Sequence, residues 1–424
     1  MVHSGPLRDI RALEFSMIYA APFAGIQLTD MGAEVIKVEP IEGEQMRHMG
    51  GGGVPGHGKG YQWMNRGKRD IALNLREQRG REIIHRLVPE VDVVLVNFRP
   101  GVPERLGIDY ETLSAINPRL VYAEIIGFGR SGPLAGRAAS DIVAQAYGGA
   151  IAVDGKVDDD GAPVWVSIPV GDLPAGMSAV AGICAALYHR EQTGEGQRIT
   201  VSLLRTVMAL NGMHVMREPL ADLQTVIPRM EEIDRVREAG GSYDAIIKAR
   251  MGGPPSLGLT LYFTGYRAKD GGIVLGALTR ANRDAIRKVV GIEGDPYDEP
   301  GFEPGDPKNR EIAAALQAQI RRKLLEKTVD EWIELFEAAG APVSPVKLPE
   351  ELADDPQGSL QMVEVVDELT GPQRGVGPLF DMSKTPTAVA GPAPVLGADT
   401  DAILAGAGYS EQEIARLRAD HIVA

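Results

Sequence analysis

The chain has 424 residues, 44% of them hydrophobic and 24% charged, which is typical of a globular protein with a substantial core. Its formal net charge of −14 argues against nucleic acid as a partner, and no run of 18 apolar residues predicts a membrane span. Cys184, the single cysteine, excludes an internal disulfide, and no secretory signal is found, so we expect a cytoplasmic protein. The seven histidines lack metal-ligand spacing, so we expect no metal site.

Strands and helices alternate through the first half of the chain. Apolar runs predict strands at 10–15, 34–38, 92–98 and 120–129, and helical patterns are found at 25–31, 78–88 and 110–116. This alternation predicts an α/β fold with a parallel, doubly wound sheet, in which ligands bind beyond the carboxyl ends of the strands. No GxGxxG motif follows the first strand, which disfavours a nicotinamide cofactor and an oxidoreductase.

The composition changes from about residue 220, where a polar, charged segment begins. Two strand-like runs at 261–268 and 271–278, with the turn sequence KDGG between them, predict a hairpin. Helices at 309–325 and 329–338 complete a second, smaller unit. The chain closes with a pair of helices, the last of which begins at a capping box formed by Ser410 and Glu413.

Residues 163–176, PVWVSIPVGDLPAG, join an apolar, β-rich run to a helix rich in small residues. The pattern predicts a strand-to-helix junction at Gly171 and Asp172, where the positive end of the helix favours an anion. Asp172 is therefore either an N-cap or a placed nucleophile. The local residues alone favour the cap, because aspartate is a preferred capping residue.

Several motifs, in this order along the chain, resemble the class III coenzyme A transferases, the family that includes formyl-CoA transferase and the α-methylacyl-CoA racemases. They are AAPFAGIQLTDMGAEVIKVEP, NRGKRDIALNL, VNFRPGVPERLGI, INPRLVYAEIIGFG, SDIVAQAYGG, VGDLPAG and HREQTGEGQ. The resemblance is sharp from Leu7 to about Leu210 and weaker through 220–340.

The resemblance implies an α/β fold with a large Rossmann-like domain built from both chain ends, 1–220 and 340–424, and a smaller α+β domain with its linkers at 221–339. It also implies an interlocked homodimer, which should persist at high dilution because its subunits can separate only by unfolding. Acyl-CoA, or coenzyme A, and small carboxylic acids are the implied substrates. No permanently bound cofactor, membrane or nucleic acid is expected.

The activity implied is transfer of CoA from an acyl-CoA donor to a carboxylic acid acceptor, with Asp172 as the nucleophile. Attack on the thioester would give an aspartyl anhydride and then an aspartyl-CoA thioester. With the resemblance added, we favour the nucleophile over the cap for Asp172. Asp141 matches an acidic family position near the reacting centre, but a Ser-Asp pair that opens a helix is equally consistent with a cap. Tyr19 is the third residue expected at this centre.

The resemblance also implies which side chains form the CoA-binding slot. They are Ile18, Leu73, Asn74, Leu75, Arg76, Asn97, Arg99, Val102, Arg105 and Leu106. Arg105 is the strongest candidate for a phosphate contact, against the alternative that it lies on the solvated face of a short helix. Gly252 and Gly253 correspond either to a mobile glycine loop over the active aspartate or to a plain turn.

The chain departs from the family pattern at three positions. Ser140 stands where the racemases have a histidine, and its hydroxyl cannot abstract an α-proton near neutral pH, which disfavours a racemase. Tyr19 replaces a glutamine of formyl-CoA transferase, so we do not expect oxalate as the acceptor. Pro40 replaces an arginine that contacts adenine in many relatives, a contact for which Arg47 and Arg66 are the alternatives.

Three other functions stay open from the sequence. The first is an intramolecular CoA transferase acting on an unsaturated dicarboxylic acyl-CoA, which would use the same nucleophile and release no free acid. The second is an acyl-CoA racemase, and the third is a non-catalytic acyl-CoA-binding protein. The sequence does not name the donor and acceptor acids.

Overall fold

The computed structural model describes residues 5–49, 51, 53–252, 261–302 and 306–424. They form two compact units, Met1–Glu218 with Leu360–Ala424, and Pro219–Ser359. We expected the chain to return to the large domain at residue 340. In the structure, β9 (Val343–Pro345) instead pairs with β8 (Gly272–Gly276), so residues up to Ser359 group with the smaller unit.

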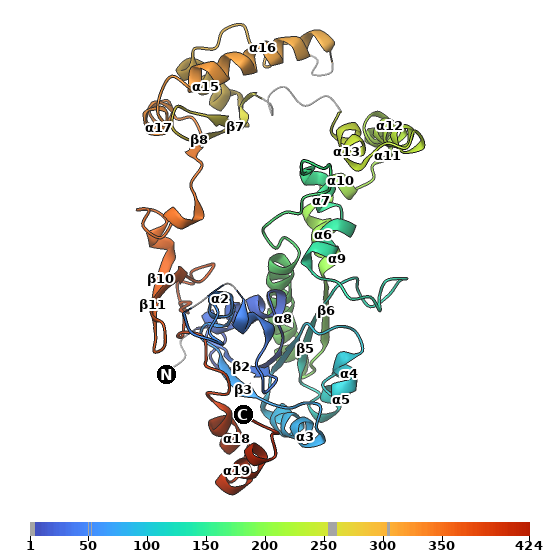
Figure 1. The fold of residues 1–424 in the computed structure, drawn as a ribbon, viewed down its shortest axis with the longest axis vertical. Helices are drawn as coiled ribbons and strands as arrows, with labels where there is room; N and C mark the ends of the chain where they lie inside the picture. Colours follow the sequence, from blue (N-terminus) through green and yellow to red (C-terminus); the bar gives the residue numbers. More distant parts are fainter. Residues whose placement is uncertain (1–4, 50, 52, 253–260, 303–305) are drawn as a thin grey trace. The chain divides into compact units, whose positions relative to one another are not determined.

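A six-stranded parallel sheet lies at the centre of the large unit (Figure 1). Its strands are β1 (Arg11–Phe15), β2 (Glu34–Glu39), β3 (Arg69–Ala72), β4 (Val93–Val96), β5 (Val121–Ile126) and β6 (Arg198–Ser202). They are ordered β3-β2-β1-β4-β5-β6, and every neighbouring pair is parallel. The predicted α/β fold with a doubly wound parallel sheet is therefore confirmed. The strand order reverses between β1 and β4, where such sheets bind their ligands.

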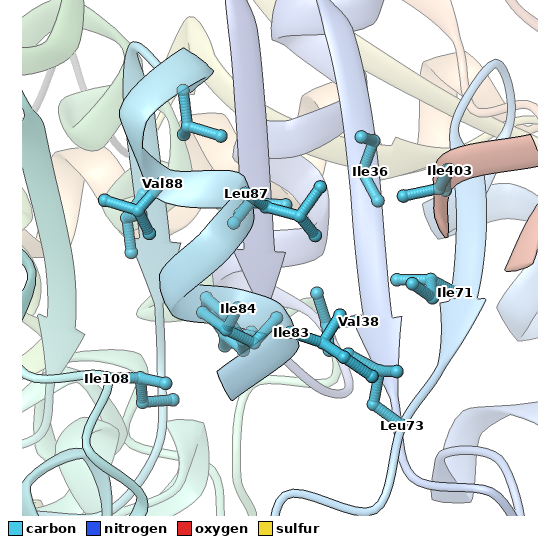
Figure 2. Packing of buried hydrophobic residues seen from close by; sticks show 14 of the residues in the cluster. Ile36, Val38, Ile71, Leu73, Ile83, Ile84, Leu87, Val88, Ile108 and Ile403 are labelled. Carbon is cyan, nitrogen blue, oxygen red and sulfur yellow. The ribbon is translucent and has the colours of Figure 1, made fainter. Parts of the chain in front are cut away.

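Helices cover both faces of this sheet, because alternate strand residues point to opposite faces. On one face, apolar side chains of β2 and β3 meet α3 (Gln78–Leu87) and α18 (Thr400–Gly406) (Figure 2). On the other face, small side chains of α1 (Ala20–Asp30) and α8 (Asp172–Thr193) pack on β1, β4 and β5. The two helices approach closely at Gly176, where a Cβ atom would lie 2.6 Å from the carbonyl oxygen of Ala20.

The C-terminal segment completes the edge of the sheet beside β3 (Figure 1). Asp399 accepts a hydrogen bond from the Asp70 amide at 3.0 Å and pairs with Arg69 at 3.1 Å. Val423 forms an antiparallel bridge with Leu73. The predicted capping box of Ser410 and Glu413 is present at the start of α19 (Glu411–Ala419). Both chain ends therefore belong to one unit.

The smaller unit contains the antiparallel sheet β7-β8-β9 and its own apolar core. β7 (Phe263–Arg267) and β8 form the hairpin predicted around the KDGG turn. α15 (Arg280–Val290), α16 (Pro307–Leu324) and α17 (Val329–Ala338) contribute apolar residues to this core. The polar segment before them forms α11 (Pro219–Gln224), α12 (Val226–Glu238) and α13 (Tyr243–Met251).

The large unit contains further elements. They are α2 (Lys59–Asn65), α4 (Val102–Leu106), α5 (Tyr110–Ile116), α6 (Asp141–Tyr147), α7 (Ala150–Asp154), α9 (Leu203–Leu210), α10 (Gly212–Val215) and the hairpin of β10 (Met362–Asp367) and β11 (Gly371–Val376). The short 3-10 helix η1 (Gln45–His48) follows β2.

The prediction of a strand before Asp172 is wrong. Residues 164–171 are irregular, and the Trp165 and Ile168 side chains are 46% and 63% exposed. Pro163 and Pro169 have no amide hydrogen for a strand ladder. The main chain of Val166 instead pairs with the Gln145 side-chain amide, at 3.0 and 3.1 Å. Asp172 therefore follows a loop.

Gly176→Ala should lower the free energy of unfolding by about 2 kcal/mol, because the new methyl group would push the main chain of α1 away from α8. Gly406→Ala, in α18 with open space around it, is the matched control and should be neutral or slightly stabilising. Urea unfolding of both variants measures the difference, and equal stabilities would contradict the packing argument.

Candidate functional site

A cavity of about 820 Å³ lies where the strand order reverses, beyond the carboxyl ends of β1, β4 and β5. It is lined by residues 17–20, Gln45, Arg76, 97–100, Val102, Arg105, Leu106, 125–127, 137–141, Asp172 and Leu203. All of these belong to the large unit. The volume is in the range of pockets that hold small organic ligands. The doubly wound topology therefore places the cavity where the sequence predicted ligand binding.

Asp172 is the first residue of α8, and Gly171 is the N-cap of this helix. The Asp172 side chain is partly buried and lines the cavity. Its carboxylate forms no hydrogen bond with any residue that the structure describes. Asp172 is therefore not the N-cap of α8. The carboxylate is left available at the positive end of a 22-residue helix.

Asp141 takes the capping role that the sequence offered to Asp172. One of its carboxylate oxygens, Oδ1, accepts hydrogen bonds from the amides of Gly171 at 2.6 Å and Asp172 at 2.9 Å. The other oxygen accepts from the side chain of Gln145. A Cβ atom on Gly171 would lie 2.8 Å from Oδ1, so only glycine leaves this space open. Asp141 is the first residue of α6, but its carboxylate accepts hydrogen bonds from the start of α8 and so caps that later helix.

Burial and, as the smaller cause, the negative charge of nearby Asp141 together raise the pKa of Asp172 to about 7. Desolvation disfavours the ionised carboxylate, and a second carboxylate repels it. Asp172 therefore changes its ionisation close to neutral pH. A carboxyl group with this property in a cavity is typical of a catalytic position.

Four arginines line the same cavity: Arg76, Arg99, Arg105 and Arg137. They are exposed, and none of the four guanidinium groups forms an ion pair or a hydrogen bond with the described part of the chain. Cations without a protein partner can bind phosphate or carboxylate groups of a ligand. The sequence predicted the first three of these. Arg137 was missed, although it lies only three residues before the Ser140-Asp141 motif.

The loop after β1 has an unusual backbone. Ile18 has a φ of 69°, a left-handed conformation that is rare for a β-branched residue. The Asn97 side chain holds the preceding peptide, accepting from the Met17 amide at 3.0 Å and donating to the Met17 carbonyl at 2.8 Å. The Tyr19 ring meets Trp63 edge to face, 5.9 Å between centroids. Two residues predicted to bind CoA, Ile18 and Asn97, thus also shape this wall.

Several other predicted residues are not among those that line the cavity. Leu73 is buried in the core and Leu75 packs against it. The side chain of Asn74 accepts a hydrogen bond from the Arg76 amide at 3.2 Å. Gly252 is the C-cap of α13 in the smaller unit, and Gly253 lies outside the described residues.

The two arginines considered for an adenine contact already have protein partners. Arg47 pairs with Glu39 at 2.7 Å in the interior, and Arg66 pairs with Asp30 at 2.6 Å. Neither lines the cavity. By contrast, Val102, Leu106 and Phe98 do line it. Phe98 was missed, although it lies between two predicted residues at the end of β4.

The described residues contain no group of three or more His, Cys, Asp or Glu side chains that could hold a metal ion. Within the same residues, no helix has both the length and the apolar character needed to span a bilayer.

Asp172→Asn should stabilise the protein increasingly as pH rises. The folded-state pKa of Asp172, about 7, exceeds the ordinary value of 3.8, so the contribution of the aspartic acid is complete below about pH 4 and is lost as pH rises through 7. Asparagine carries no charge to desolvate. The variant should match the wild type near pH 4 and exceed it at pH 8 by up to about 4 kcal/mol, the ceiling set by a shift of about three pKa units. Urea unfolding across this range measures the difference, and a gain that shrinks with rising pH would contradict it.

Comparison with known proteins places this geometry in a family. The family model for CoA-transferase family III matches residues 7–400. The formyl-CoA:oxalate CoA-transferase of Escherichia coli O157:H7 is 30% identical over 430 residues, which cover 99% of this chain and 100% of that protein. The succinyl-CoA–D-citramalate CoA-transferase of Chloroflexus aurantiacus is 30% identical over 426 residues, covering 99% of this chain and 98% of that protein.

Solved structures agree. A CAIB/BAIF family protein from Brucella suis superposes with a TM-score of 0.73 at 28% identity, covering 95% of this chain and 100% of that one. Rv3272 from Mycobacterium tuberculosis superposes with a TM-score of 0.74 at 25% identity, covering 94% of this chain and 99% of that one. The family match, the relatives and the fold agree along nearly the whole chain. This protein belongs to CoA-transferase family III.

Proposed function

We propose that this protein moves CoA from an acyl-CoA donor to a carboxylic acid acceptor, with Asp172 as the nucleophile. The observation that carries the proposal is the composition of one cavity. It contains a carboxylate without a hydrogen-bond partner among the described residues and four arginines without an ion-pair partner there. The carboxylate suits attack on a thioester, and the cations suit a ligand that carries several phosphates.

The chemistry proceeds through two covalent states of Asp172. The ionised carboxylate attacks the thioester carbonyl, the carbon–sulfur bond breaks, and CoA thiolate leaves a mixed anhydride. The thiolate then attacks the aspartyl carbonyl of the anhydride, which releases the donor acid and forms an aspartyl-CoA thioester. An acceptor carboxylate reverses these two steps and leaves as the new acyl-CoA, so the free energy of the thioester is retained.

The role proposed for Asp141 is positioning. Its hydrogen bonds to the amides of Gly171 and Asp172 fix the start of α8, and its charge adds to the burial that keeps the pKa of Asp172 near 7. Attack requires the ionised form, which is the major one only above that pH. Ser140 also lines the cavity, and its hydroxyl is too weak a base for α-proton abstraction. These features favour CoA transfer over racemisation.

The arginines are proposed to bind the phosphates of CoA, with Arg105 as the principal contact. The protein carries a formal charge of −14, so four guanidinium groups in one cavity are a local exception that favours an anionic ligand. Tyr19 forms another part of the wall beside Trp63. An acceptor acid with apolar surface suits this aromatic wall better than a small dianion such as oxalate.

We also propose a homodimer, with the interlocked arrangement that the family resemblance implies. Residues 208–216, near the end of the first part of the large unit, include several long apolar side chains that are exposed. They are Met208, Leu210, Met213 and Met216, which are 38%, 58%, 96% and 68% exposed. Grouped apolar exposure of this kind is typical of a surface that another chain covers.

Asp172→Asn should reduce turnover by at least about a thousandfold while CoA affinity changes by less than about threefold, because the nucleophile is lost and the arginines are retained. With succinyl-CoA and other donors tested in turn, hydroxylamine should convert the wild-type Asp172 to a hydroxamate that mass spectrometry locates. Asp160→Asn, at an exposed aspartate, is the matched control and should behave as wild type. Wild-type turnover by the Asp172 variant would refute the nucleophile.

The dimer proposal predicts a constant dimeric mass down to nanomolar concentration and no subunit exchange between two differently tagged samples mixed in native buffer. Exchange should appear only after the mixture is unfolded and refolded. Light scattering and affinity capture make these measurements. A monomeric mass would refute the dimer, and mixed dimers formed without unfolding would refute the interlocking.

A further inference from the structure

We infer that Glu44 is a positioning residue that fixes the cavity loop, defined as Ser16–Tyr19, and thereby sets the affinity for CoA without touching it. The inference rests on the proposed function, because it concerns the wall of the same cavity. Met17, Ile18 and Tyr19 of this loop line the cavity, whereas Glu44 does not. Glu44 must therefore act through the loop.

The cavity loop requires an external hold because its backbone is strained. Ile18 has a φ of 69°, and in this left-handed region the Cβ of a branched residue crowds the main chain. Such a conformation persists only when the surroundings determine it. The Ile18 amide donates a hydrogen bond to Oε2 of Glu44 at 3.1 Å, directly at the strained residue.

Glu44 is itself held in place by buried charges. Its side chain is buried, and its Oε1 pairs with Lys37 Nζ at 3.0 Å. Its amide donates to Oε2 of Glu39 at 2.8 Å. Both partners lie on β2, so the carboxylate of Glu44 is fixed relative to the central sheet. A buried carboxylate with a buried cation partner is costly to displace.

Lys37 extends this hold to the start of the cavity loop. Its ammonium group is fully buried and donates to the carbonyl oxygen of Ser16 at 3.2 Å. It also pairs with Glu14 of β1 at 3.4 Å. The loop is thus held at Ser16 by Lys37 and at Ile18 by Glu44. Asn97 holds Met17 between them, but Asn97 itself lines the cavity. Two side chains therefore hold residues 17 and 18. The Asn97 amide lines the cavity, whereas the Glu44 carboxylate does not.

The placement of Glu44 also affects a second part of the wall. The next residue, Gln45, begins η1 and lines the cavity. Loss of the Glu44 carboxylate would therefore loosen two neighbouring segments of the wall together. Asp172 is held separately, by Asp141 at the start of α8. We expect affinity for CoA to fall while the chemical step at Asp172 is largely preserved.

The test compares Glu44→Ala and Glu44→Gln with Glu42→Ala, the matched control at an exposed glutamate two residues earlier. Hydrogen exchange of the ligand-free protein reports on the cavity loop, calorimetry with CoA gives the dissociation constant, and steady-state assays give KM and kcat. Glutamine keeps the side-chain volume and one acceptor, so it reports on the role even where alanine fails to fold.

Glu44→Ala should exchange the loop amides at least tenfold faster and raise the Kd and KM about tenfold, with kcat within threefold of wild type. Glu44→Gln should show a smaller change in the same direction, and Glu42→Ala none. Unchanged exchange in both Glu44 variants would overturn the inference, as would faster exchange with unchanged CoA affinity or a fall in kcat alone. A wild-type protein that binds no CoA, with exchange changed as expected, would refute the proposed function and leave the loop hold standing.

Discussion

The site depends on one carboxylate placed against the start of one helix. Asp141 accepts the amides of Gly171 and Asp172 through a single oxygen, and the missing side chain of Gly171 provides the room. Hydrogen bonds from main-chain amides to an ionised acceptor are stronger than neutral ones. Because Asp141 satisfies this helix end, Asp172 need not cap its own helix. The same proximity adds to the burial that raises the pKa of Asp172 to about 7.

Charge is distributed unevenly in this acidic protein. Four arginines without carboxylate partners among the described residues face the cavity, while other cations are paired in the interior. Lys68, which pairs with Glu14 at 2.8 Å, has its pKa lowered to about 8 by desolvation. Burial and the neighbouring Glu39 raise the pKa of Asp70. A buried ion pair adds little net stability over a well-packed apolar replacement, but removing one of its partners is costly.

The doubly wound topology brings these parts together. The loops after β1 and β4 diverge because the strand order reverses between these strands, and the cavity opens there. Residues that lie far apart within the first 218 positions, such as Ile18, Asn97 and Asp172, therefore line one cavity. The C-terminal segment closes the far edge of the sheet through Asp399 and Val423. The solved proteins from Brucella suis and Mycobacterium tuberculosis share this overall fold.

Local pattern was sufficient for much of this structure. Alternating apolar runs determined the parallel sheet and most helix positions, because burial on a sheet or helix face has a fixed period. The motifs also singled out Asp172, Asp141 and three of the four cavity arginines. In each case the signal lies within a few residues of the side chain concerned.

Contacts between distant residues were decided only by the tertiary structure. The sequence could not show that Asp141 caps a helix that begins 31 positions later, or that the Gln145 side chain replaces a strand partner for Val166. Both Arg105 and Leu73 were predicted to bind CoA, and the sequence could not show that Arg105 lines the cavity whereas Leu73 is buried in the core. Hydrogen bonding and burial at these positions depend on which segments the fold brings together. The residues next to each position in the sequence do not show which distant segments these are.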